Sequence, residues 1–271
     1  MAEEKERSFF EKASPLFILL SIVLAFFVGT LWQKVRTLEK GNAERVQQGA
    51  TSAPSQAENA KVSMDTIRGL FDKDVIKFGN KDSKLIFVEI SDPNCPYCAV
   101  ASGENPELNK TFREGRFKLV KDGGNYVSPV SEMRKFIDEG KASFIYVYYP
   151  GHGLDEMEAK VLYCAYEMDK FWPVHDLLMS SAGFDFLNKN EQVTEKKSDK
   201  FAQFFKSVVD PVKMKECLDS DRYKSRVQSD MDLAVSLGLQ GTPMFFVNDT
   251  RFDGAYSFSD MEPVVKAALG E

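Results

Sequence analysis

The stretch KLIFVEISDPNCPYCAVAS, residues 84–102, decides the fold because it joins a strand, a turn and a cysteine motif. Its first part, KLIFVEI, is a short apolar run rich in β-forming residues and predicts a buried strand. The polar turn SDPN follows, and Pro96 suits the first turn of a helix, where an N–H would have no partner. The sequence therefore predicts that Cys95 and Cys98 lie where a strand passes into a helix.

A Cys-x-x-Cys pair in this position favours redox chemistry. The N-terminus of the helix stabilises a thiolate at the first cysteine, and the second cysteine stays within its reach. Cys95 is therefore the expected nucleophile, at the exposed start of the helix. Cys98, one turn further on and more buried, is the expected resolving thiol, which attacks a mixed disulfide and releases the substrate.

Two structural alternatives to this redox pair are half of a zinc site and an inert disulfide. A zinc site needs four ligands at close spacing. The remaining cysteines, Cys164 and Cys217, stand far along the chain, and His152 and His175 do not form a ligand-like pair. No metal site is expected.

A second feature is Gly241-Thr242-Pro243, which precedes the strand-like run PMFFVN at residues 243–248. Proline has no N–H for the β ladder and so belongs at the start of a strand. Taken alone, such a proline is usually an ordinary trans residue. Together with the cysteine pair, it predicts a cis Thr242-Pro243 bond that brings the Thr242 backbone close to the cysteines.

The remaining pattern mixes strands and helices. Residues 128–140 predict a helix, and ASFIYVYYP, residues 142–150, predicts a central strand. Residues 154–237 have helical periodicity throughout and interrupt a strand-based domain. A hairpin is expected after Pro243, followed by a closing helix with a capping box formed by Ser259 and Glu262.

These features together resemble the DsbA-like thiol:disulfide oxidoreductases of the thioredoxin superfamily, because EISDPNCPYC is followed much later by LGLQGTPMFFVN. The likeness covers about residues 76–269. It implies an α/β fold, in which a thioredoxin-like sheet carries an inserted helical domain at about residues 154–237. It also implies catalysis by cysteines without a cofactor.

The resemblance also assigns roles to individual residues. It implies that Cys95 attacks, that Cys98 resolves and that Pro243 is the cis-proline. It further implies that Glu89 is a buried acid whose raised pKa lets it exchange the proton of Cys98; the alternative is a solvent-facing strand residue. The residues expected to contact substrate are Thr242, Pro96 and Tyr97.

The sequence departs from the family at two places. The dipeptide between the cysteines is Pro96-Tyr97 rather than the Pro-His of the most oxidising members. Because tyrosine cannot donate an imidazolium-like charge, we expect a less depressed Cys95 pKa and a less oxidising couple. Residues 103–127 are irregular and unmatched, with a possible short strand at FKLV around Phe117.

The second pair of cysteines, Cys164 and Cys217, lies in the helical region. An even count of four cysteines in an exported protein predicts a structural disulfide between them. The alternatives are two free buried thiols or a second redox relay. Of the histidines, His175 is expected to be a core or helix-surface residue and His152 a turn residue.

The N-terminal region predicts a membrane anchor. Residues 13–32 contain no charged side chain, and 20 helical residues span about 30 Å, enough to cross a bilayer. A tail at residues 1–12 precedes this anchor, a flexible linker at 33–63 follows it, and the folded domain is expected at 64–271. A cleaved signal peptide is the alternative. Both place the domain outside the cytoplasm, and the anchor leaves the N-terminus inside.

The expected function is disulfide formation in cysteine-containing exported proteins. The resemblance implies that a membrane redox partner, DsbB-like or vitamin K epoxide reductase-like, takes up the electrons. A net charge of −6 and the lack of a long basic run disfavour nucleic acid as a partner. The alternatives are a disulfide reductase, an isomerase, a cytosolic-facing glutaredoxin-like enzyme and a non-catalytic, chaperone-like binding module.

Overall fold

A five-stranded sheet in the order β1-β3-β2-β4-β5 forms the centre of the protein. The structure is a computed structural model that describes residues 62–152, 156–190 and 197–271. β2 and β3 run parallel, and the other pairs are antiparallel. The strands are β1 Ile76–Phe78, β2 Ile86–Ser91, β3 Ser143–Tyr148, β4 Met244–Val247 and β5 Thr250–Asp253.

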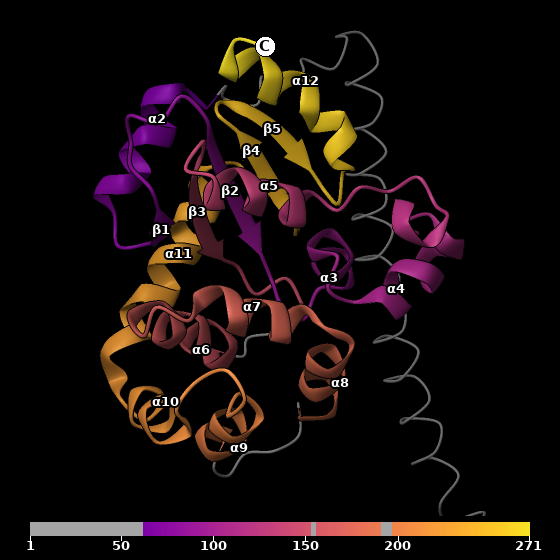
Figure 1. Cartoon of the computed structure of the whole chain (residues 1–271). Coiled ribbons are helices and arrows are strands. Elements are labelled where there is room, and N and C mark those ends of the chain that lie inside the picture. The colour runs from indigo at the N-terminus through magenta and orange to yellow at the C-terminus, as the bar shows by residue number, and fades with distance from the viewer. Residues whose placement is uncertain (1–61, 153–155, 191–196) are drawn as a thin grey trace, which may run out of the picture. The chain divides into compact units, whose positions relative to one another are not determined.

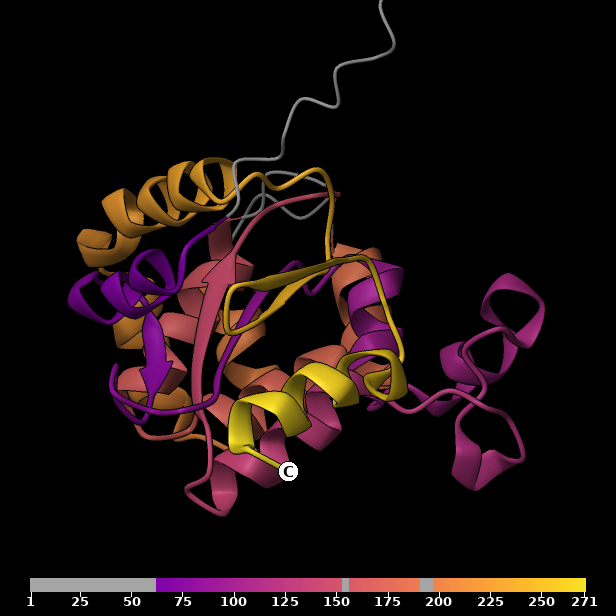
Figure 2. The same cartoon turned by 90° about the horizontal axis from the view of Figure 1, so that it is seen from above.

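Helices cover both faces of this sheet. Figure 2 shows α2 and α11 on one side and α5 and α12 on the other, and Figure 1 shows α6 to α10 gathered together. The α-helices are α2 Met64–Gly69, α3 Pro96–Ser102, α4 Pro106–Thr111, α5 Pro129–Asp138, α6 Glu156–Glu167, α7 Phe171–Met179, α8 Ser181–Asn190, α9 Lys197–Phe204, α10 Pro211–Leu218, α11 Lys224–Ser236 and α12 Phe258–Leu269. Short 3₁₀ turns are η1 Leu70–Asp72, η2 Phe112–Gly115, η3 Val120–Asp122 and η4 Asp221–Tyr223.

The central strands β2 and β3 are buried along their whole length. Because side chains alternate along a strand, Val88 and Ile145 face the core shared with α2 and α11, whereas Phe87 and Tyr146 face the larger core shared with α5, α7 and α12. Parallel pairing places the carboxyl ends of β2 and β3 side by side. The segments that follow both strands therefore meet at one edge of the sheet.

The fold confirms an α/β thioredoxin-like architecture with a helical insertion. Helices α6 to α11 interrupt the sheet between β3 and β4, where the helical periodicity at 154–237 predicted an insertion. The strand before the cysteines, α3, α5, β3 and the β4–β5 hairpin are also confirmed. The predicted tail and anchor lie outside the described residues, as does most of the predicted linker. Within the described ranges, no helix combines the length and apolarity needed to cross a bilayer.

Two local predictions were wrong. The capping box of α12 is formed by Ser257 and Asp260 rather than Ser259 and Glu262. Ser257 has the extended backbone of an N-cap, and its hydroxyl accepts the Val127 N–H at 3.1 Å, which fixes the start of the helix two residues earlier. The FKLV segment forms no strand; Leu119 makes only an isolated bridge, because Phe117 and Leu119 pack in a small cluster of their own.

Candidate active site

The two cysteines occupy the start of α3, as the sequence predicted. Cys95 is the N-cap residue, and its backbone N–H donates to the carbonyl of Asp92 at 2.9 Å. Cys95 and Cys98 both carry free thiols. The Cys95 thiol donates to the Thr242 carbonyl at 3.3 Å, and the Asp92 N–H donates to the Cys98 sulfur at 3.5 Å. The turn after β2 and the loop before β4 therefore hold the pair from two sides.

The two thiols differ strongly in acidity. A hydrogen bond from Cys98 lowers the pKa of Cys95 to about 6 despite the opposing effect of burial. Burial, reinforced by the neighbouring Cys95, raises the pKa of Cys98 well above its usual range. At neutral pH Cys95 is therefore a thiolate and Cys98 a thiol. The different acidities match the attacking and resolving roles expected for them.

Cys95 is more enclosed than the sequence predicted. Cys95 and Cys98 both have no exposed surface, whereas Cys95 was expected at an exposed helix end. The difference arises from Met179 at the end of α7, which packs against both cysteines together with Tyr97. The local motif shows the start of α3 but not the helix that covers it. The Cys95 sulfur therefore lies beneath the side chains of Met179 and Tyr97.

The Thr242-Pro243 peptide bond is cis, and it lies beside the pair. The Thr242 hydroxyl is buried and has no hydrogen-bond partner among the described residues. Gly151 approaches it closely, because a Cβ at this glycine would lie 2.8 Å from the Thr242 Oγ1 and 3.4 Å from the Asp92 Oδ2. A side chain at position 151 would therefore press on both loops.

Sequence reasoning missed the contribution of Asp92 and His152. The Asp92 carboxylate is buried, and it accepts the His152 N–H at 2.9 Å while the His152 Nδ1 lies 3.2 Å away. Burial raises the pKa of Asp92, against the opposing effects of the Asn94 N–H and of His152. The His152 charge is also one of the influences that lower the pKa of Cys95. The turn after β3 thus places an imidazole against Asp92, in the turn that leads to the two cysteines.

A sequence signal for this contact existed. His152 follows a predicted central strand, and Asp92 follows its parallel neighbour. Functional groups in α/β proteins gather at the carboxyl ends of parallel strands. The pairing of the two strands, which a single sequence does not reveal, is what makes the two residues neighbours.

Glu89 is 1% exposed, so the solvent-facing alternative is wrong. Both of its carboxylate oxygens are without a hydrogen-bond partner within the described part of the chain. Burial raises the pKa of this carboxyl, opposed by the charge on His175 and by the Ser91 hydroxyl. A buried carboxyl with a raised pKa is suited to proton exchange, and the exchange with Cys98 itself stays a prediction.

A cavity of about 710 Å³ opens beside the Thr242-Pro243 loop. Tyr97, Thr242 and Pro243 line it from the active site, and Phe117 and Tyr126 line it from the irregular segment 103–127. Pro96, also expected to contact substrate, is not among the lining residues. The unmatched segment is therefore one wall of the cavity next to the cysteines.

Segment 103–127, which forms this wall, also contacts the cysteine motif directly. The Nε of Arg113 donates to the Tyr97 hydroxyl at 2.8 Å, and its guanidinium lies 5.7 Å from the centre of the Tyr97 ring. Arg113 and Glu114 have left-handed backbone angles, φ 51° and 59°, which non-glycine residues adopt at a cost in energy. The strained turn places Arg113 over Tyr97, one of the two residues between the cysteines.

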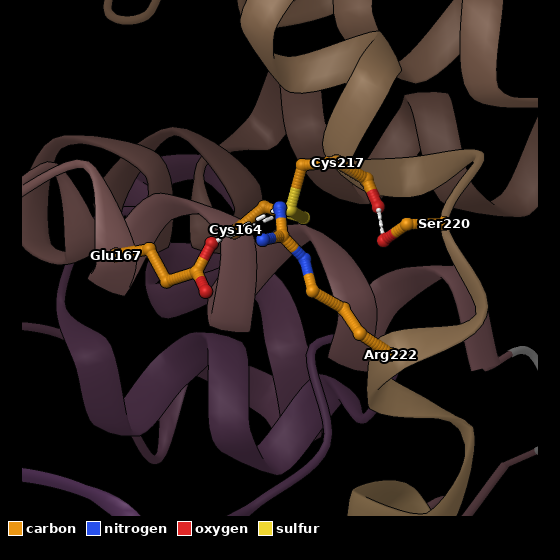
Figure 3. The surroundings of a disulfide bond; sticks show 5 residues. All are labelled: Cys164, Glu167, Cys217, Ser220 and Arg222. Carbon is orange, nitrogen blue, oxygen red and sulfur yellow. Dashed lines mark hydrogen bonds and ion pairs between the residues drawn. A yellow bond between two sulfur atoms is a disulfide. The ribbon is translucent and has the colours of Figure 1, made fainter.

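Cys164 and Cys217 form a disulfide that joins α6 to α10 across 53 residues. Figure 3 shows Glu167 and Arg222 in front of this bond. The Arg222 Nη2 and the Glu167 Oε2 form an ion pair at 3.2 Å. The bond connects two helices of the insertion and no residue of the cysteine motif. Within the described ranges, no three His, Cys, Asp or Glu side chains cluster as metal ligands would.

The pH dependence of alkylation tests the acidity of the two thiols. We expect iodoacetamide to label Cys95 of the reduced protein with a rate that rises through pH 6 and then levels off, because only the thiolate reacts. Enclosure slows labelling but leaves its midpoint in place. Cys98 is expected to stay unlabelled up to about pH 9, since burial raises its pKa. Mass spectrometry distinguishes the two sites, and preferential labelling of Cys98 would reverse the assigned roles.

Comparison with known proteins found a matching family model and solved structures of the same fold. A family model described as Thioredoxin matches residues 129–267, a region that begins after the cysteine pair. Two solved structures have the same fold. Oxidised BdbD from Bacillus subtilis is 21% identical, with a TM-score of 0.50 over 73% of this chain and 94% of that one. The thiol-disulfide exchange protein alpha-DsbA2 from Wolbachia pipientis is 17% identical, with a TM-score of 0.52 over 80% of this chain and 100% of that one.

The names of the curated relatives fall into two groups, those that refer to disulfide chemistry and those that refer to Na(+)/H(+) antiporters. Disulfide bond formation protein D of Bacillus subtilis is 26% identical over 70% of this chain and 75% of its own length. A putative protein-disulfide oxidoreductase of Rickettsia felis is 24% identical over 83% of this chain and 72% of its own length. The Na(+)/H(+) antiporter NhaA 3 of Salinispora tropica is 24% identical, and the chain spans a quarter of its length.

Proposed function

The chain belongs to the thioredoxin family, and on that premise we propose that it is a thiol:disulfide oxidoreductase that forms disulfides in exported proteins through Cys95 and Cys98. The observation that carries this proposal is the placement of the two free thiols at the start of α3, where Cys95 contacts the carbonyl of Thr242 beside the cis Thr242-Pro243 bond. The names of the relatives from Bacillus subtilis and Rickettsia felis support the same reaction.

In the proposed reaction, a substrate thiolate attacks the Cys95 sulfur of the oxidised pair. Cys98 leaves and takes up a proton, and the substrate is then joined to Cys95 in a mixed disulfide. A second substrate thiolate attacks the substrate sulfur of this mixed disulfide, and Cys95 leaves as a thiolate. Two electrons pass from the substrate dithiol to the enzyme pair.

The low pKa of Cys95 favours this direction. A thiolate with a lowered pKa is a good leaving group, and its stability in the reduced enzyme makes the couple more oxidising. Thr242 pairs with the backbone of the bound peptide, and Tyr97 contacts the peptide from the cysteine motif. The cavity beside Pro243 has the size and the aromatic wall to hold substrate side chains.

Oxidative folding tests the function. We expect the oxidised protein to form disulfides in a reduced, unfolded protein many times faster than an equal concentration of oxidised glutathione does. The matched control is the Cys95→Ser variant, which keeps the fold but lacks the nucleophile. Reduction of an already oxidised substrate by the reduced protein, without oxidation of the reduced one, would instead show a reductase.

We also propose that residues 13–32 anchor the protein in the cell membrane, with residues 1–12 in the cytoplasm and the domain at 64–271 outside it. Residues 33–63 serve as the linker. In this location a DsbB-like or vitamin K epoxide reductase-like membrane protein would reoxidise the cysteine pair.

Protease accessibility tests the location. A protease added to cells without their outer layers should digest residues 64–271 and leave a membrane-bound N-terminal fragment. A cytoplasmic protein provides the control for cell integrity. Full protection of the domain would place it in the cytoplasm.

A further inference from the structure

Four buried polar side chains of the core each have a polar atom without a hydrogen-bond partner among the described residues, and only one of them, Glu89, has been given a role in the exchange reaction described above. Glu89, Ser91, Tyr146 and His175 each have 1% or less of their surface exposed. In the part of the chain that the structure describes, no hydrogen-bond partner reaches either Glu89 oxygen, the Ser91 hydroxyl, the Tyr146 hydroxyl or the Nε2 of His175. Buried polar groups are usually paired, so a group of unpaired ones needs an explanation.

The sheet brings these side chains together. Glu89 on β2 is directly opposite Tyr146 on β3, and both strands present these residues to the same core as Phe87. The ring of Tyr146 contacts the ring of His175, with 6.0 Å between the centroids and an angle of 80°. His175 therefore lies over the strand pair that carries Glu89.

Helix α7 connects this group to the cysteines. His175 and Met179 are four residues apart and so lie on the same face of the helix, one turn from each other. Met179 packs against Cys95 and Cys98, and His175 packs against Tyr146. Figure 1 shows α7 next to α3 and at the ends of β2 and β3.

The same helix offers a path to solvent. The His175 Nδ1 lies 3.1 Å from the Asp176 Oδ1, and the Asp176 side chain is 40% exposed. Two further charged groups face this end. Arg134 of α5 has its Nη1 3.9 Å from the Asp176 Oδ2, and Glu104 after α3 interacts with both His175 and Asp176.

We propose that His175 and Asp176 form a proton relay between solvent and the buried Glu89, and through Glu89 to the thiol of Cys98. The proposal rests on the proposed exchange reaction. When Cys98 leaves during attack by a substrate thiolate, a proton passes from Asp176 to the His175 Nδ1, from the Nε2 to Glu89, and from Glu89 to the Cys98 sulfur. Because the Nε2 and both Glu89 oxygens make no direct hydrogen bond among the described residues, a bridging water carries the proton across each of the last two gaps. When Cys98 attacks a mixed disulfide, the proton travels the other way, and no electrons move along the relay.

The acidities of the two buried groups suit such transfer. Burial raises the pKa of Glu89, with the charge on His175 acting in the opposite direction. Burial would lower the pKa of His175, but the hydrogen bond to Asp176 and the charge on Glu89 outweigh it, and the pKa is raised. Both shifts make the groups easier to protonate than they are in water, so each can take up a proton and pass it on.

The aromatic surroundings of His175 allow a substitution that removes the imidazole and keeps the packing. Its ring stacks on Phe171 at 5.5 Å and meets Trp172 at 5.6 Å, so a phenylalanine ring fits the same aromatic site. His175→Phe removes both ring nitrogens, including the unpaired Nε2, and should leave thermal stability close to that of the wild type.

The test follows the reduced protein as it reacts with Ellman's reagent. The first thionitrobenzoate released reports attack by Cys95, and the second reports attack by Cys98 on the resulting mixed disulfide. We expect His175→Phe to slow the second release on the order of a hundredfold near pH 7, the lower end of what positioned proton transfer contributes, and to leave the first release unchanged. The deficit should shrink above about pH 9, where hydroxide can accept the proton instead.

Asp176→Asn serves as the second variant because it lies at the partly exposed end of the relay and does not disturb the core. We expect it to slow the second release with the same pH dependence, and Asp232→Asn, an exposed carboxylate on α11, to change nothing. The relay is wrong if both variants keep the wild-type rate and pH profile, or if both releases slow equally. If the wild type gives no second release, the proposed exchange itself fails, and the relay fails with it.

Discussion

Replacing Cys98 with alanine is expected to leave the protein joined to its substrates by disulfides that it cannot release. The low pKa of Cys95 keeps this thiol reactive in the variant, so it still attacks a disulfide-containing protein. Without Cys98, the protein has no thiol of its own at the site to attack this mixed disulfide, and only a thiol of the substrate can reverse it. Turnover should fall to the uncatalysed level. Covalent complexes should be visible on gels run without a reducing agent and disappear when one is added.

The control for this trapping experiment is the double variant Cys95→Ser with Cys98→Ala, which should capture nothing. Capture that persists in the double variant would mean that Cys164 or Cys217 carries the reaction. Capture by Cys95→Ser alone would instead show that Cys98 is the attacking thiol. Each result points to a different cysteine, so the experiment assigns the roles directly.

Removing the disulfide between Cys164 and Cys217 is expected to lower the free energy of unfolding by about 2–4 kcal/mol. The bond closes a loop of 53 residues, and opening such a loop gives the unfolded chain more conformational freedom. Because α6 and α10 contribute no residue to the cysteine motif, disulfide exchange should continue at nearly the wild-type rate. Chemical denaturation and oxidative folding assays measure the two effects.

Unfolding is best compared in a background that carries Cys95→Ala and Cys98→Ala, so that only the second pair of cysteines differs between the two proteins. Cys164→Ala with Cys217→Ala is then the single change. Unchanged stability combined with lost turnover, measured with Cys95 and Cys98 restored, would make this pair a second redox relay rather than a structural bond.

The parts of the fold that the sequence predicted depend on short-range patterns. The strand before Cys95, the turn and α3 follow one another within 19 residues, and each has its own signal in hydrophobicity, turn residues or proline position. The helical insertion was recognisable because its periodicity continues for about eighty residues. β1 was missed, since its three residues Ile76–Phe78 are too few to show alternation.

The parts that the sequence could not predict depend on contacts between distant segments. Asp92 and His152 are 60 residues apart and meet only because β2 and β3 are parallel neighbours. The cover over Cys95 comes from Met179, which belongs to a different helix. His175 looked like a core residue, and it is one. Its position over Tyr146 and Glu89 becomes visible only when α7 is placed on the sheet.

Residues 103–127, which form the cavity wall, connect α3 to α5. The aromatic side chains of this segment pack mainly among themselves. The buried Asn109 amide closes this segment by donating to the carbonyls of Val100 and Phe117, both at 3.1 Å. None of the strands passes through it. Insertions, deletions or substitutions in this segment therefore leave the sheet and the two thiols in place. They change only the cavity wall, and with it the range of substrate proteins that fit.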